Sequence, residues 1–135
     1  MNKQERVRLY MDYLVEEGFR PTVDSDGDVT FKAEGGLYCI DIDENDDEYF
    51  RILYPNFWKV ESEQERTRVI SASNYATMVT KVAKVYLRSD DKDTCAAVEM
   101  FVNPPENFKP VFARAMRALR SSVKTFVEKM GETGG

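Results

Sequence analysis

The last part of the chain carries a helical pattern that constrains the fold more than any other feature. Apolar residues recur three or four positions apart over residues 108–130, which is the spacing of a helix with one apolar face. They are Phe108, Val111, Phe112, Ala115, Leu119, Val123, Phe126, Val127 and Met130. Two prolines, at positions 104 and 105, precede the stripe and favour a helix start. We therefore predict a long amphipathic final helix.

Several short segments alternate apolar and polar residues, which is the pattern of strands with one buried face. These predicted strands cover residues 21–23, 29–33, 37–43, 49–54, 79–87 and 94–102. Turn residues separate the first four, which we therefore expect to form an antiparallel meander. Pro55 and Asn56 are predicted to end the fourth strand.

Two further helices are predicted from their ends and their periodicity. Helical spacing within residues 2–17 is followed by Gly18, which suits a left-handed C-cap. Ser62 and Glu65 have the spacing of a capping box, and a stripe of small residues follows as far as Thr77. The predicted fold is α+β, an antiparallel sheet packed by helices in the order α-β-β-β-β-α-β-β-α.

The chain is predicted to form one domain. Its 135 residues are 42% hydrophobic, which suffices for a core without disulfides or metals, and the sequence contains neither an internal repeat nor a linker. We assign residues 1–130 to this domain and residues 131–135 to a flexible tail, because the tail has nothing to bury.

The residue types argue against catalysis. The sequence has no histidine, which removes the commonest general base, the usual catalytic triads and most zinc chemistry. It also has no glycine-rich phosphate loop and no nucleophile motif. Cys39 and Cys95 lie in predicted strands without metal-ligand spacing. We expect no enzyme activity, no cofactor and no bound metal.

Charge and hydropathy limit the partners. The formal net charge of -5 repels nucleic acid and anionic lipid. The chain has no apolar stretch long enough for a signal sequence or a membrane span. We therefore expect a cytoplasmic protein that binds neither nucleic acid nor membrane.

Two acidic segments resemble metal sites only at first sight. A calcium loop counted from Asp24 needs glycine at its sixth position and glutamate at its twelfth, where the sequence has Val29 and Gly35. We expect a solvated hairpin turn there. The carboxylates within residues 41–48 are expected to be solvated as well, because a flexible acidic loop binds cations weakly.

Two groups of residues are candidate interaction sites. Phe57 and Trp58 follow the predicted end of a strand, and exposed aromatic residues in a connection are typical interface anchors. Burial under the second helix is the alternative. The final helix also carries a basic stripe that suits an acidic protein surface. It consists of Arg114, Arg117 and Arg120 and continues with Lys124. An ordinary solvated face is the alternative, and pairing of this stripe with residues 41–48 of a second copy is a further hypothesis.

Four segments carry a resemblance to a known family. They are residues 13–19, YLVEEGF; residues 28–31, DVTF; residues 76–87, ATMVTKVAKVYL; and residues 97–101, AVEMF. Together with the order of elements, they make the chain resemble the bacterial YbjN-like family, also called sensory transduction regulator-like. The resemblance implies a fold like that of type III secretion chaperones, frequent dimerisation and a surface for a client chain. It assigns no functional residues.

These observations lead to one functional hypothesis and one alternative. The hypothesis is a non-enzymatic protein-interaction module that binds an unidentified partner polypeptide as a homodimer, through an exposed sheet face or through Phe57 and Trp58. The alternative is a regulatory domain that senses a small ligand. A concave apolar pocket with converging polar groups favours the alternative, and a flat apolar patch favours the interaction module.

Overall fold

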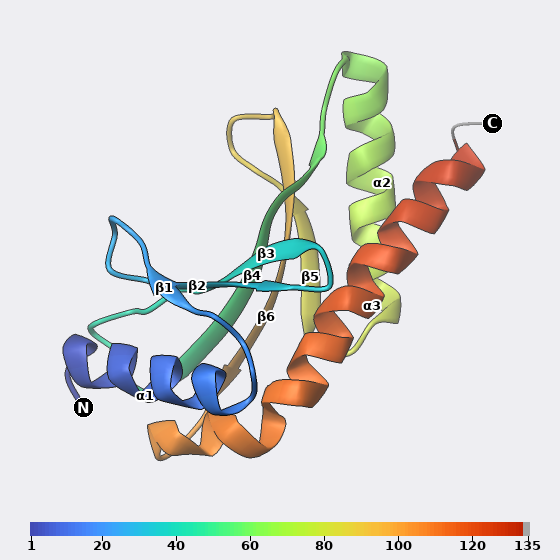
Figure 1. Cartoon of the computed structure of the whole chain (residues 1–135). Helices are drawn as coiled ribbons and strands as arrows, with labels where there is room; N and C mark the ends of the chain where they lie inside the picture. Colours follow the sequence, from blue (N-terminus) through green and yellow to red (C-terminus); the bar gives the residue numbers. More distant parts are fainter. Residues whose placement is uncertain (134–135) are drawn as a thin grey trace.

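The computed structural model describes residues 1–133, and within them the helices and strands alternate as the pattern predicts. Figure 1 shows the elements, which are α1 (Lys3–Glu16), β1 (Thr22–Val23), β2 (Val29–Ala33), β3 (Gly36–Ile40), β4 (Tyr49–Lys59), α2 (Glu63–Val79), β5 (Ala83–Leu87), β6 (Asp93–Phe101) and α3 (Lys109–Thr133). A short 3₁₀ helix, η1 (Pro105–Phe108), leads into α3. The predicted α+β class and the order of its elements are confirmed.

The six strands form one antiparallel sheet in the order β1-β2-β3-β4-β6-β5. β4 and β6 pair from Tyr49 opposite Phe101 to Lys59 opposite Asp93, and so form the long centre of the sheet. β5 is the edge strand beside β6, and it starts only at Ala83, opposite Val98. The end of β6 therefore extends beyond the start of β5.

The core lies between one face of the sheet and the helices. Alternate strand residues such as Phe31, Phe50 and Ile52 are fully buried. Aromatic rings on α1 and α3 contact this face: Tyr10 lies 5.9 Å from Phe50, and Phe112 lies 6.0 Å from Phe31, measured between ring centroids. α2 packs against α3 and the edge strand β5 (Figure 1).

Helix caps and turns follow the predicted local chemistry. The Ser62 hydroxyl accepts a hydrogen bond from the backbone N–H of Glu65, which caps the start of α2. Gly18 has a φ of +92°, and the N–H of Phe19 bonds to the carbonyl of Leu14, as in a Schellman motif. The two-residue turn at Glu34 and Gly35 has positive φ at both positions, which suits a tight hairpin between β2 and β3.

Several predicted boundaries were wrong by more than one residue. The strand predicted to reach residue 43 ends at Ile40. β4 does not end at Pro55 and Asn56, because Asn56 adopts a φ of +53° within a bulge and the strand continues to Lys59. Val79 ends α2 instead of starting a strand. The helix α3 continues through Gly131 to Thr133, so part of the predicted tail is helical, and residues 134–135 lie outside the described residues.

Candidate functional site

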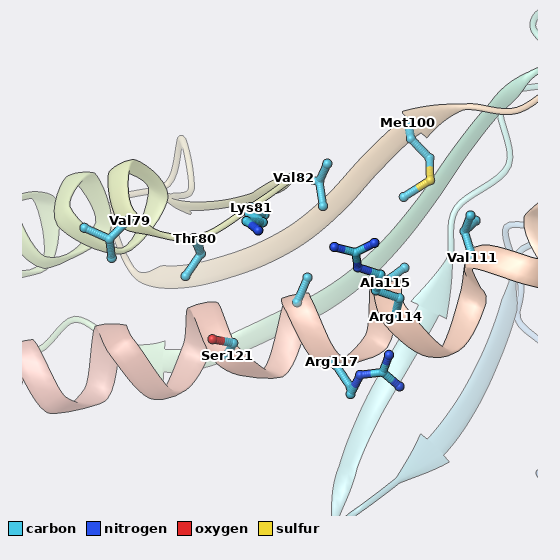
Figure 2. A pocket seen from close by; sticks show the side chains of 11 residues that line it. Val79, Thr80, Lys81, Val82, Met100, Val111, Arg114, Ala115, Arg117 and Ser121 are labelled. Atoms are coloured by element: carbon cyan, nitrogen blue, oxygen red, sulfur yellow. The ribbon is translucent and has the colours of Figure 1, made fainter.

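An apolar groove lies beside the first half of α3. Its volume is about 630 Å³. The apolar part of its lining consists of Val79, Val82, Met100, Val111, Ala115 and Ala118, and the polar part consists of Thr80, Lys81, Arg114, Arg117 and Ser121. Figure 2 shows that these residues come from α3, from the end of β6 and from the α2–β5 connection. We call this feature the α3 groove.

The unequal lengths of β5 and β6 create the groove. The chain leaves α2 at Val79 and enters β5 at Ala83, opposite Val98. The next residues of β6, as far as Phe101, pair with β4 on one side only among the described residues. α3 passes this free end of β6, where its alanines at positions 115 and 118 leave room that larger side chains would fill.

The α2–β5 connection forms one wall of the groove. Val82 in this wall has an unusual backbone conformation. Its φ is +54°, in the left-handed region that costs an L-residue about 1–2 kcal/mol and is rare for β-branched residues. Its side chain is 60% exposed, so burial in the core does not offset this cost. Val79, in the same wall, is 48% exposed. The fold therefore holds an aliphatic side chain at the groove at the expense of stability.

The charged residues of the α3 groove are all cationic. Lys81 comes from the α2–β5 connection, whereas Arg114 and Arg117 come from α3 (Figure 2). None of the described residues that line the groove carries a carboxylate. Within residues 1–133 none of the three cations forms a salt bridge. An anionic group that enters the groove meets positive charge from two walls.

The predicted basic stripe is divided by the structure. Arg114 and Arg117 line the α3 groove, but Arg120 does not. The Nε of Arg120 lies 3.3 Å from a carboxylate oxygen of Glu34, at the tip of the β2–β3 hairpin. Arg120 and Glu34 belong to a second hollow of about 340 Å³, which Glu17 and Arg117 also line, so its charges are balanced.

Phe57 and Trp58 do not lie in a connection, contrary to expectation. Both belong to β4, Phe57 within the bulged segment and Trp58 where pairing with β6 resumes, and both are half-buried. Their rings contact Phe126 of α3, with centroids 5.3 Å from Phe57 and 5.5 Å from Trp58. Both rings thus pack against α3. Neither lines the α3 groove.

The sheet face opposite the helices carries a network of paired polar groups. Arg51 forms salt bridges with Asp41 and with Glu99, and it donates a hydrogen bond of 2.9 Å to the hydroxyl of Tyr86. Glu99 also binds Lys84 at 2.7 Å and accepts a hydrogen bond from Tyr49. Burial by itself raises the pKa of Glu99, but the bonds from Lys84 and Tyr49 and the charge of Arg51 lower it overall. Because these groups satisfy one another, they offer little to a ligand.

The acidic segment at residues 41–48 forms ion pairs and hydrogen bonds with other parts of the chain. Besides the pair between Asp41 and Arg51, the carboxylate of Asp47 lies 3.0 Å from the amino group of Met1. Arg6 donates hydrogen bonds to the carbonyl oxygens of Asp43 and Tyr49 and thereby holds the ends of this loop. These contacts give the segment a structural role. Pairing with the basic stripe of a second copy stays a prediction.

Three possible metal ligands also meet near the first hairpin. A carboxylate oxygen from each of Asp24 and Asp28 and the sulfur of Cys39 lie within 4.8 Å of one another. Asp24 accepts hydrogen bonds from the backbone N–H groups of Asp26 and Asp28, at 2.9 and 3.0 Å, as the predicted turn requires. Burial, followed by the charges of Asp28 and Asp24, raises the pKa of Cys39 to about 12. A protonated thiol is a poor metal ligand.

The raised pKa also makes Cys39 unreactive. We expect iodoacetamide to alkylate Cys39 at pH 8 at least roughly a hundredfold more slowly than N-acetylcysteine, because the thiolate is the nucleophile. The rate should still rise with pH above 9, and peptide mass spectrometry distinguishes Cys39 from the buried Cys95. Alkylation at the rate of N-acetylcysteine would contradict this assignment.

The sequence patterns predict only part of the groove. The alternation predicts a strand over residues 79–87, whereas residues 79–82 form the end of α2 and the connection that lines the groove. The available signal was an apolar pair, Met78 and Val79, next to the helix end, where both side chains are in fact exposed. The spacing of Arg114 and Arg117 did identify the charged side of the groove.

Comparisons with known proteins inform on the fold. No family model matches the chain, and no curated protein matches it significantly. The structure is similar to the crystal structure of an uncharacterized protein from Methanothermobacter thermautotrophicus, with a TM-score of 0.58, 14% sequence identity, and coverage of 93% of this chain and 99% of that one. At this identity the similarity concerns the fold alone. Among the described residues, no helix is both long and apolar enough to cross a bilayer.

Proposed function

We propose that this chain is a non-enzymatic protein-interaction module that binds a partner polypeptide in the α3 groove. The observation that carries the proposal is Val82, whose exposed side chain is held in a costly backbone conformation within the groove wall. The neighbouring apolar residues Val79 and Met100 extend the surface that a partner side chain would cover.

The sequence resemblance and the fold support the same proposal. The chain resembles the YbjN-like family, which implies a fold like that of secretion chaperones, and the structure has the predicted α+β class. We propose in addition that the protein acts as a homodimer in the cytoplasm. Its two cysteines are free thiols, which fits a reducing compartment. Light scattering of the purified protein tests the dimer.

A second candidate function is sensing of a small anionic amphiphile. The concavity of the groove favours it, since a volume of about 630 Å³ lies within the usual range of small-molecule sites. Lys81, Arg114 and Arg117, which line the groove, would bind the anionic head. In this case a fatty acid would raise the melting temperature, whereas an unfolded polypeptide would not bind.

The polypeptide-binding proposal predicts opposite effects of one substitution on stability and on binding. Val82→Asn should increase the free energy of unfolding by roughly 1 kcal/mol, because asparagine tolerates positive φ better than valine. The same change should weaken binding of a fluorescent, reduced and carboxymethylated unfolded protein, because it removes an aliphatic contact. Urea denaturation and fluorescence anisotropy measure the two effects.

Val15→Asn is the matched control. Val15 is equally exposed, at 61%, but lies on α1 within ordinary helical geometry. This variant should not be more stable than wild type and should bind the unfolded protein normally. If Val82→Asn binds as well as wild type, or if wild type does not bind at all, the proposed function is wrong.

A further inference from the structure

We infer that the partner segment bound in the α3 groove is acidic and amphipathic, with apolar side chains directed at the floor and carboxylates directed at the walls. This inference rests on the proposed function and specifies the chemistry of the partner. It follows from the charges of the groove, from their positions on two walls and from the extent of the exposed apolar surface.

The charge of the groove contrasts with that of the whole chain. The protein has a formal net charge of -5, yet the α3 groove presents Lys81, Arg114 and Arg117 without any carboxylate. The adjacent hollow on the other side of α3 shows that basic residues of this helix can be neutralised internally, since Arg120 pairs with Glu34 there. Within residues 1–133 Lys81 and Arg114 have no salt-bridge partner, and Arg117, which also lines the second hollow, has none either, so a partner carboxylate would meet unpaired cations.

The cations flank the apolar floor from both sides. Arg114 and Arg117 are one helical turn apart on α3, about 5 Å along its axis. Lys81 approaches from the α2–β5 connection, on the side of Val82 and Met100 (Figure 2). A segment lying in the groove would therefore need carboxylates near both walls and apolar side chains between them.

The apolar surface also continues beyond the groove. Val79 and Val82 are about half exposed at its rim, and Met78, next to Val79 on α2, is 68% exposed. A small ligand confined to the groove would leave this surface in water. A polypeptide segment can cover the floor and the rim together, which favours a chain over a small amphiphile.

Short fluorescent peptides of one length test the charge preference. One alternates leucine with glutamate, one alternates leucine with lysine, and one alternates leucine with serine. Anisotropy titrations of the wild-type protein should show tightest binding of the leucine–glutamate peptide, with an affinity that falls as salt is added. The double variant Arg114→Glu/Arg117→Glu reverses two charges of the groove. It should bind the leucine–glutamate peptide about tenfold or more weakly than wild type, since attraction is replaced by repulsion. The reversed variant should bind the leucine–lysine peptide better than wild type does.

A second charge reversal controls for net charge. Arg20 and Lys32 are exposed and line a different hollow, so Arg20→Glu/Lys32→Glu changes the net charge equally without touching the groove. Equal losses in both double variants would overturn the inference, because they indicate a long-range effect. Equal wild-type affinity for all three peptides, abolished by Val82→Asn, would also overturn it but leave the proposed function intact. If no peptide and no unfolded protein binds, both proposals are wrong.

Discussion

Replacing Phe108 with alanine is expected to lower the free energy of unfolding by about 3–5 kcal/mol, the largest loss we expect from a single truncation. Phe108 is fully buried at the junction of η1 and α3. Its ring centroid lies 4.9 Å from those of Tyr10 and Tyr13, both on α1, and 5.4 Å from that of Phe50 on β4. Truncation therefore leaves a cavity where a helix pair meets the sheet. Urea denaturation followed by circular dichroism measures the loss.

Phe101→Ala is the matched control for this prediction. Phe101 is 77% exposed at the end of β6, so its truncation removes little buried area. It should change stability by less than about 1 kcal/mol. Comparable losses in the two variants would mean that Phe108 does not hold the junction described above.

Substituting methionine for Arg6 is expected to destabilise the protein by about 3 kcal/mol. The Arg6 side chain is 1% exposed, and it donates to the carbonyl oxygens of Asp43 and Tyr49. Methionine fills much of the same volume but donates no hydrogen bond, so two loop carbonyls lose their partner. Chemical denaturation measures the change, and faster amide hydrogen exchange within residues 43–49 should accompany it.

Arg8→Met provides the comparison for Arg6. Arg8 lies on the same helix and is exposed, so this variant loses the same charge without losing a buried hydrogen bond. It should be within about 0.5 kcal/mol of wild type. If Arg6→Met is equally mild, the guanidinium does not stabilise the acidic loop.

Much of the fold follows from local sequence patterns. The alternation of Tyr38, Ile40 and Ile42 correctly placed these side chains on the buried face, because neighbouring residues of a strand point to opposite faces. The end of β4 could not be predicted in this way. Pro55 and Asn56 are ordinary break signals, and only pairing with β6 on both sides of the bulge shows that the strand continues. The burial of Arg6 could not be predicted from the helical stripe either. Its hydrogen-bond acceptors are backbone carbonyls far along the chain, which no local pattern identifies.

The candidate site was predictable only in part. Helical spacing identified Arg114 and Arg117 on one surface of α3. It could not show that Arg120 turns to Glu34, because that contact depends on where the β2–β3 hairpin packs. Nor could it reveal the groove, which exists because β5 begins opposite Val98 while β6 runs on to Phe101. Differences in strand length and backbone conformation, such as the positive φ of Val82, are tertiary features without a local pattern.

Site-specific photocrosslinking tests the central claim, that the α3 groove binds polypeptide, most directly. Benzoylphenylalanine is introduced singly at Val82 in the groove, at Leu37 on the opposite sheet face and at Val15 on α1, all of which are exposed. Each protein is irradiated with a carboxymethylated unfolded protein and analysed by mass spectrometry. If the α3 groove binds polypeptide, crosslinks should be strong from position 82 and weak from positions 37 and 15. Crosslinks of equal strength from all three positions, or crosslinks only from position 37, would contradict it.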